Sequence, residues 1–439
     1  MQVKFEQQLN RITKSGLFLF FLLASPSTSL LARPLQNAER ERRYCLDSRY
    51  LADTRIVSCS RALQAFPLDG RLWIQRGLAR KVKNDYPAAL QDLNRGLELS
   101  PQAAKAYHKR GQIWLKLQNF GEAEKDFSQA LKLGHTNAEI YADRAFSFHQ
   151  QSKFELARAD YDRVIALSKD DTHLYAYFMR GRLWHEQGQF MKALDDYNRS
   201  LVLGGNPKFI FMERGLLWYQ LGNYEKALAD YNWVLEEEPT HVIALHNRAL
   251  VWLQMKDYRQ AEMDCTRSLS LQPDYAEGYY TLAFIAKKSY QHELVVYNLS
   301  QYLKLQSQNN LTQFGEIFHM RAWAFALLGK YPEAHADILS MIASSPSSSL
   351  VARFTQAWIF YLQGEITQSR QLLAQVLHQA PASEWSSWLQ DYLPELFKGI
   401  QSDTERESLK NMLKEAQEQE SHTSLSLFCD TLLRLKERS

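Results

Sequence analysis

The sequence contains little cysteine and none of the common catalytic or metal-binding motifs. Only four cysteines occur in 439 residues, and no two of them form a CxxC pair. The HExxH, GxSxG and glycine-rich phosphate-loop patterns are also missing. Such patterns carry zinc, nucleophile and nucleotide chemistry. We therefore expect a protein that is not an enzyme and that requires no cofactor and no metal.

The chain also lacks an excess of charge of one sign. Its 52 Lys and Arg residues face 49 Asp and Glu residues, which gives a net charge of +3. Binding to phosphates requires clustered positive charge. Nucleic acid is therefore not an expected partner.

Long apolar runs are absent, since the longest strongly apolar stretch, Leu17 to Ala24, has only eight residues. A membrane-spanning helix needs about 20. Three basic residues precede this stretch and a Ser/Pro-rich segment follows it, an order typical of a signal peptide. We expect residues 1–32 to contain a signal peptide that is cleaved after Ser29 or after Ala32. Cleavage would leave an exported protein, periplasmic or secreted, without a stable membrane span. No cysteine stands where a lipoprotein is acylated, and an uncleaved anchor is the alternative.

Small residues recur along most of the chain at a spacing close to 34. The first series is Gly77, Gly111, Ala145, Gly181, Gly215, Ala249, Ala283, Ala322 and Ala357. A second series follows twelve residues later in each unit, from Ala89 to Ser369, and an aromatic residue such as Tyr86 or Phe120 usually stands between the two. Because each unit combines helical spacing with one central break, it predicts two antiparallel helices that must stack on their neighbours to bury their apolar faces.

The pattern of Trp73, Gly77, Tyr86, Ala89 and Pro101 resembles the tetratricopeptide repeat family. The resemblance implies an all-α fold, a right-handed superhelical solenoid with a concave groove that holds proteins or peptides. We expect nine repeats over residues 70–383, a degenerate N-terminal repeat over 36–69, and C-terminal capping helices over 384–439.

The degenerate repeat places Cys45 and Cys59 on its two helices. In an exported chain a local pair of cysteines favours a disulfide that closes the exposed end of the array. Two buried free thiols are the alternative.

An arginine precedes the first small residue in seven of the nine units, and an aspartate follows that arginine by sixteen residues. The other two units lack both partners and have Leu282 with Asn298 and Gln356 with Leu372. Joint presence and joint loss predict structural ion pairs within the hairpins, because a partly buried charge is costly without its counter-ion. A ladder of arginines for an anionic ligand is the alternative. The predicted pairs are Arg76–Asp92, Arg110–Asp126, Arg144–Asp160, Arg180–Asp196, Arg214–Asp230, Arg248–Asp264 and Arg321–Asp337.

The family resemblance places the groove on the first helix of each repeat, where many side chains of this sequence are aromatic. Exposed apolar surface often marks a binding site, and aromatic residues dominate interface hot spots. The alternative is that these side chains pack on one another or are covered by the C-terminal helices. The expected groove residues are Phe146, Tyr175, Phe178, Phe209, Met212, Tyr219, His246, Tyr280, Phe284, Trp323 and Trp358.

We therefore expect an exported scaffold or adaptor, most simply a bacterial periplasmic one, that binds segments of other proteins. A periplasmic assembly chaperone or regulator of envelope enzymes is the first alternative, and a glycan-binding solenoid is the second. The sequence leaves the partner and the oligomeric state open.

Overall fold

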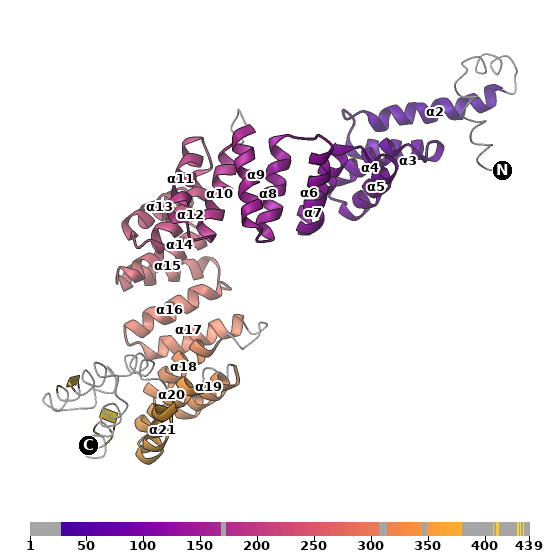
Figure 1. Cartoon of the computed structure of the whole chain (residues 1–439). Helices are drawn as coiled ribbons and strands as arrows, with labels where there is room; N and C mark the ends of the chain where they lie inside the picture. Colours follow the sequence, from indigo (N-terminus) through magenta and orange to yellow (C-terminus); the bar gives the residue numbers. More distant parts are fainter. Residues whose placement is uncertain are drawn as a thin grey trace. The chain divides into compact units, whose positions relative to one another are not determined.

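The structure is a computed structural model that describes residues 28–167, 173–306, 314–344 and 349–379, with a few isolated positions between 407 and 433. Over these residues the regular structure is helical and consists of twenty helices (Figure 1). The predicted C-terminal capping helices and most of the predicted signal peptide lie outside the described residues. Helix α2 begins at Thr28, so the two expected cleavage positions lie in its first turns.

The twenty helices follow one another as ten hairpins, which confirms the predicted all-helical repeat array. In the first five hairpins the pairs are α2 (Thr28–Leu46) with α3 (Ala52–Ala65), α4 (Gly70–Val82) with α5 (Tyr86–Leu99), α6 (Ala104–Lys116) with α7 (Phe120–Lys132), α8 (Ala138–Gln150) with α9 (Phe154–Leu167), and α10 (His173–Glu186) with α11 (Phe190–Val202). In the last five they are α12 (Pro207–Gln220) with α13 (Tyr224–Glu237), α14 (Val242–Gln254) with α15 (Tyr258–Leu271), α16 (Ala276–Lys288) with α17 (His292–Leu305), α18 (Gly315–Leu327) with α19 (Tyr331–Ser344), and α20 (Ser349–Gln363) with α21 (Ile366–Gln379).

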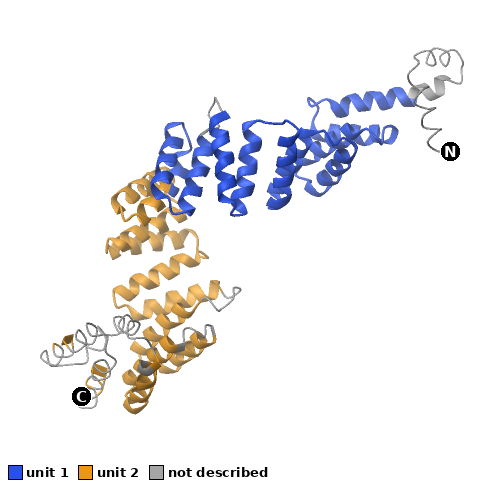
Figure 2. Cartoon of the chain, viewed as in Figure 1, with its two compact units in different colours: residues 1–213 blue, residues 214–439 orange. Residues whose placement is uncertain are grey.

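The chain divides into two compact units, residues 1–213 and 214–439, which are described separately (Figure 2). Within each unit the helices of a hairpin pack on each other, and consecutive hairpins are stacked.

The turn inside each hairpin explains the break that recurs in the sequence. Gly222 adopts a positive φ of 72°, which a glycine reaches without strain. The next residue, Asn223, caps α13 by accepting a hydrogen bond from the backbone N–H of Lys226. The recurring aromatic residue, here Tyr224, is the first residue of the second helix. The same order of Asn84, Asp85 and the aromatic residue starts α5.

The small residues allow the two helices of a hairpin to approach closely. A Cβ atom on Gly111 would lie only 2.6 Å from Cε1 of Phe127 on the partner helix. Gly181 faces the ring of Tyr197 in the same way, and Gly215 faces that of Tyr231. The three rings are almost completely buried. At these three positions of the series, a large ring of one helix therefore lies on the backbone of the other, whereas Gly77 faces the smaller Leu93.

The seven predicted ion pairs are present, each within one hairpin. In every pair the arginine donates from Nε and Nη2 to the two carboxylate oxygens of the aspartate, at distances between 2.6 and 2.9 Å. All seven aspartates are buried. This two-point geometry is among the stronger side-chain interactions in proteins.

Six of the seven arginines also connect neighbouring hairpins, and this second role was not predicted from the sequence. Arg248 Nη1 donates to Asn232 Oδ1 on α13 at 2.7 Å, and Arg110 Nη1 donates to Asn94 Oδ1 on α5 at 2.7 Å. Corresponding bonds from other arginines reach Ser60, Ser128, Asp162 and Ser300. The acceptor always lies on the second helix of the preceding hairpin. Each of these arginines therefore holds its own hairpin closed and ties it to the one before.

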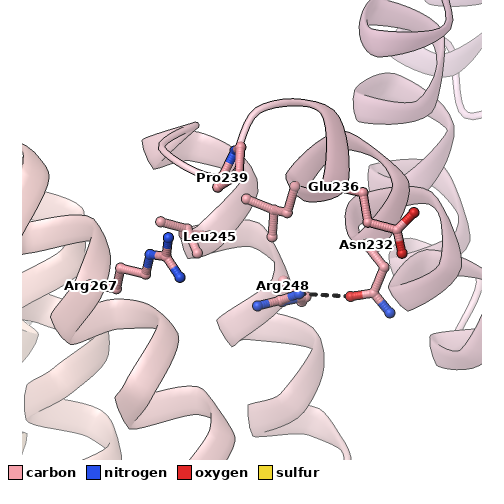
Figure 3. Close-up of a pocket in the computed structure, with 7 residues that line it drawn as sticks. Asn232, Glu236, Pro239, Leu245, Arg248 and Arg267 are labelled. Carbon is pink, nitrogen blue, oxygen red and sulfur yellow. Dashed lines mark hydrogen bonds between the residues drawn. The ribbon is translucent and has the colours of Figure 1, made fainter.

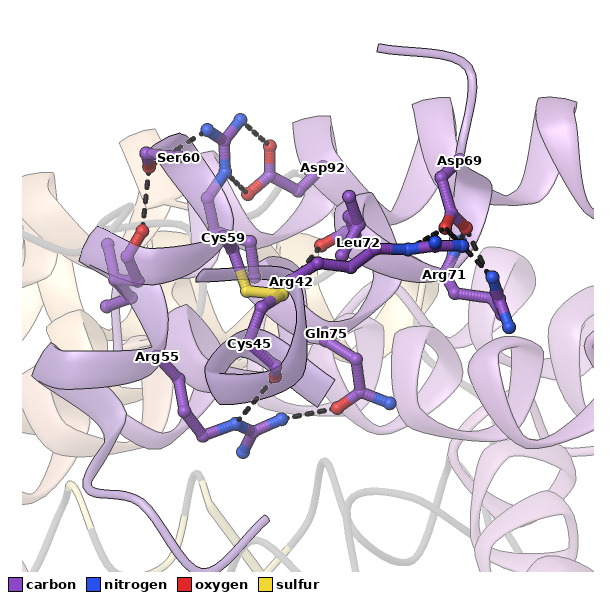
Figure 4. The surroundings of a disulfide bond; sticks show 12 residues. Arg42, Cys45, Arg55, Cys59, Ser60, Asp69, Arg71, Leu72, Gln75 and Asp92 are labelled. Atoms are coloured by element: carbon purple, nitrogen blue, oxygen red, sulfur yellow. Dashed lines mark hydrogen bonds and ion pairs between the residues drawn. A yellow bond between two sulfur atoms is a disulfide. The ribbon is translucent and has the colours of Figure 1, made fainter. Parts of the chain in front are cut away.

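A disulfide joins Cys45 on α2 to Cys59 on α3, as expected for the first hairpin (Figure 4). Both cysteines are fully buried in a small apolar cluster with Leu72 of α4. The surrounding polar groups close the same end of the array. Arg42 donates to Asp69, and Arg55 bridges the Cys45 carbonyl and Gln75. This arrangement fixes the first hairpin on the second.

Candidate functional site

A groove of about 830 Å³ crosses the first helices of four successive hairpins in the first unit. Helices α4, α6, α8 and α10 each contribute side chains to it, together with the turns after α4 and α6 and the first residues of α5 and α7. Its lining consists of Lys81, Val82, Asn84, Tyr86, Gln112, Leu115, Lys116, Gln118, Phe120, Ala142, Asp143, Phe146, Gln150 and Tyr175. The groove thus lies on the first helices, where the family resemblance placed it.

Aromatic side chains form one part of the lining. The rings of Phe120 and Phe146 meet edge to face with their centroids 6.2 Å apart. Tyr175 is 46% exposed, so a large part of its ring is open to solvent. The hydroxyl of Tyr86 donates to Asn84 Oδ1 at 2.9 Å. The groove therefore offers ring faces that a partner side chain can cover.

A polar network adjoins the groove, and its members Gln112 and Asp143 are lining residues. The ring of His108, which is 1% exposed, places Nε2 at 3.0 Å from Asp143 Oδ2 and Nδ1 at 3.1 Å from His135 Nε2. The Gln112 amide donates from Nε2 to Asp143 at 2.9 Å and to Glu139 at 2.7 Å. His108 and Gln112 lie one turn apart on α6, and Glu139 and Asp143 lie one turn apart on α8. Two adjacent helices thus present facing pairs at the i, i+4 spacing.

Two lysines border this network. Lys81 Nζ donates to Gln112 Oε1 at 2.6 Å, and Lys109 Nζ donates to the same oxygen at 3.2 Å and to Glu139 at 3.5 Å. Burial and the neighbouring charge of Lys109 lower the pKa of Lys81. Burial alone would raise the pKa of Glu139, but the hydrogen bond from Gln112 and the charge of Lys109 outweigh it and lower that pKa. The groove lining therefore carries charges of both signs, from Lys81 and Asp143.

The predicted groove residues of the first unit occupy different environments. Phe146 and Tyr175 line the groove together. Phe178 is half-buried, and its ring lies 5.9 Å from that of Tyr197. Phe209 is 58% exposed and Met212 is partly buried on α12, and neither is among the lining residues.

In the second unit, three of the predicted groove residues are buried, and the expectation that they line an open groove is wrong. Trp358 is fully buried, with its ring against Phe354 and Tyr361. Trp323 is 7% exposed. His246 is also 7% exposed because Tyr275 and Thr281 hold its two ring nitrogens at 2.9 and 3.0 Å. These side chains belong to the interior.

The other predicted residues of the second unit are partly buried. Tyr280 packs against Tyr302 with ring centroids 5.7 Å apart, and the ammonium of Lys288 lies over the ring of Phe284 at 5.3 Å. Tyr219 accepts a hydrogen bond from Gln254 at 3.3 Å. These neighbours favour the self-packing alternative in this part of the array.

A smaller concavity of about 190 Å³ lies in the second unit (Figure 3). Its lining is Asn232, Leu235, Glu236, Pro239, Leu245, Arg248 and Arg267. The guanidinium of Arg248 already donates hydrogen bonds to Asp264 and Asn232, so it belongs to the series of structural ion pairs. This concavity is the seam between consecutive hairpins.

Lys81, Glu139 and Asp143 were not predicted from the sequence, because the residues expected to line the groove were almost all apolar or aromatic. The spacing of His108 and Asp143 in the sequence could have indicated their contact. His108 and Asp143 are 35 residues apart, close to one repeat, so equivalent faces of α6 and α8 bring them together.

Over the part of the chain that the structure describes, no helix is both long and apolar enough to cross a membrane.

Models of the tetratricopeptide repeat family match residues 104–137, 142–207, 212–276 and 351–383. These segments include the groove helices α6 and α10 and the part of α8 from residue 142 onwards. None of the curated proteins matches this sequence.

Several solved structures resemble the chain. The C-terminal part of a repeat-containing protein from Cytophaga hutchinsonii is 16% identical, covers 54% of this chain and 95% of its own, and has a TM-score of 0.44. A tetratricopeptide repeat protein from Parabacteroides merdae is 21% identical, with 54% and 91% covered and a TM-score of 0.42. PilF of Pseudomonas aeruginosa is 18% identical, with 47% and 92% covered and a TM-score of 0.41.

Proposed function

We propose that the chain is a tetratricopeptide repeat protein that acts as an interaction scaffold and binds a segment of another protein in the groove of its first unit. The observation that carries this proposal is the groove itself, which crosses α4, α6, α8 and α10 and has a mixed aromatic and polar lining. Stacked repeats create extended concave surfaces of this kind.

The lining suits a polypeptide segment. A peptide requires hydrogen-bonding groups for its backbone and ring faces for its side chains. Gln150 and Gln118 supply amides, while Phe146 and Tyr175 supply rings. Aromatic residues contribute much of the energy at protein interfaces.

We further propose that the protein acts outside the cytoplasm and without catalysis. One support is the N-terminal sequence, in which basic residues precede an apolar stretch. The other is the disulfide between Cys45 and Cys59, since disulfides persist mainly in oxidising compartments. A role as an assembly chaperone or regulator of envelope enzymes would use the same groove with short-lived partners. A glycan-binding role would use the rings as stacking platforms.

The test is selection of peptides from a random library on the purified protein, followed by titration of the selected peptides. Tyr175→Ala removes the most exposed ring of the groove and should weaken binding by about tenfold or more. Phe209→Ala is the matched control, because Phe209 is exposed on α12 and is not part of the lining.

Equal weakening by both variants, or none by Tyr175→Ala, would place binding elsewhere on the protein. Retention on peptidoglycan without selection of any peptide would support the glycan alternative. Thermal unfolding of each variant shows whether the fold is intact.

A further inference from the structure

We propose that His108, Glu139 and Asp143 form a binding site for a divalent transition-metal ion, such as zinc, at the edge of the groove that Asp143 lines. The inference does not depend on the proposed peptide binding, since it rests on side chains of α6 and α8 alone. Nothing in the sequence motifs indicated it, because the ligands come from two different repeats.

The first support is the convergence of three donor atoms. One atom from each of His108, Glu139 and Asp143 lies within 4.8 Å of the other two. Two ligands on a four-coordinate zinc ion lie ~3.3 Å apart, because each bond is about 2 Å long. Each donor therefore needs to move by only about 1 Å to reach a common ion.

The second support is the group that lies between these donors. The Nε2 amino group of Gln112 is 3.2 Å from His108 Nε2, 2.7 Å from Glu139 Oε1 and 2.9 Å from Asp143 Oδ2. An N–H donor group thus sits where the lone pairs of all three side chains point. A metal ion would take this place after Gln112 rotates. The rotated amide can turn its oxygen, which is an acceptor, towards the ion.

The third support is the orientation of the imidazole. A metal-binding histidine usually donates its other ring N–H to a nearby acceptor, which directs the free lone pair towards the ion. His108 Nδ1 lies 3.1 Å from His135 Nε2, and its Nε2 lies 3.0 Å from Asp143 Oδ2. In the tautomer that carries its proton on Nδ1, the Nε2 lone pair therefore points to the side of the proposed ion.

The ligand set selects the class of ion. One imidazole with two carboxylates suits zinc, cobalt, nickel or manganese. Calcium and magnesium prefer oxygen ligands alone. Lys109 opposes binding, since its ammonium already shares Glu139 at 3.5 Å. Three protein ligands leave a further position for water or for a side chain of a bound partner.

The experiment is titration of the metal-free full-length protein, without a histidine tag, with zinc sulfate in a calorimeter. We expect one ion per chain. Glu139→Gln and Asp143→Asn should each weaken zinc binding by about tenfold or more. Both substitutions keep the shape of the side chain. Glu122→Gln is the matched control, because Glu122 lies on α7, outside the proposed ligand set, and its side chain pairs with Lys125.

Two further measurements strengthen the test. Lys109→Gln should tighten zinc binding, because it removes the competing charge next to Glu139. Cobalt(II) should give visible absorption bands that Asp143→Asn alters. The proposal is overturned if millimolar zinc does not bind, or if Glu139→Gln and Asp143→Asn bind zinc as tightly as the Glu122→Gln control.

Discussion

Arg214 and Asp230 are joined by two parallel hydrogen bonds, 2.9 Å from Nε to Oδ2 and 2.6 Å from Nη2 to Oδ1. Asp230 is buried, and burial raises its pKa although the bonds from Arg214 act in the opposite direction. The pair therefore stabilises the hairpin mainly by preventing an uncompensated buried charge.

Arg214→Ala should lower the free energy of unfolding by ~3 kcal/mol, because Asp230 loses its counter-ion. The double variant Arg214→Ala/Asp230→Ala should lose less than the sum of the two single variants. Urea unfolding followed by circular dichroism measures all three. Strictly additive losses would show that the two side chains do not depend on each other.

Asn232→Ala tests the bond between hairpins. The change removes the acceptor for Arg248 Nη1 and leaves the Asp264 pair intact. We expect a loss of about 1 kcal/mol in the free energy of unfolding, which is typical of one hydrogen bond. The change should have little effect in an Arg248→Lys background, because lysine lacks the third guanidinium donor.

The disulfide should be detected by mass spectrometry of the non-reduced protein after alkylation. Cys45 and Cys59 should remain unlabelled until a reductant is added. Burial raises the pKa of the Cys265 thiol to about 12, so Cys265 should also resist alkylation until the protein unfolds. Labelling of Cys45 and Cys59 in the native, unreduced protein would contradict the bridge.

Loss of the bridge has a stability consequence. Cys45→Ala/Cys59→Ala should lower stability by ~3 kcal/mol, since the two cysteines are separated by 14 residues in the chain. The transition of the first hairpin is the one expected to shift, because repeat arrays owe their stability to local and nearest-neighbour terms.

His246 predicts a loss of stability on acidification. Burial lowers its pKa below the unfolded value of about 6.5, so the unfolded chain takes up the proton first as the pH falls. Stability from the neutral ring is therefore present above about pH 6.5 and is lost below it. His246→Gln should reduce the fall in melting temperature between about pH 8 and pH 5.5. His335→Gln, at a half-exposed ring, is the control for the loss of an imidazole as such.

The repeat register could be predicted from the sequence because its causes are local. Gly111 must be small to accept Phe127, and the turn before Tyr224 requires a positive φ at Gly222. The ion pairs were also predictable, since each arginine and its aspartate are gained and lost together.

The environment of the groove positions could not be predicted in the same way. Tyr175 and Trp358 both lie on first helices, yet one is 46% exposed and the other fully buried. The difference depends on which helices pack around each site, and a single repeat does not contain that information. The contact of Gln112 with Glu139 and Asp143 likewise depends on how two hairpins stack.

The arginine bonds between hairpins imply cooperative blocks within residues 214–379. Arg248 and Arg321 each reach back to the preceding hairpin, but Leu282 and Gln356 occupy the corresponding positions of α16 and α20. Local unfolding should therefore begin where α16 and α20 each pack against the preceding hairpin. Native-state hydrogen exchange should resolve α16 to α19 as a block whose amides become labelled together, at a lower free energy than those of α14 and α15.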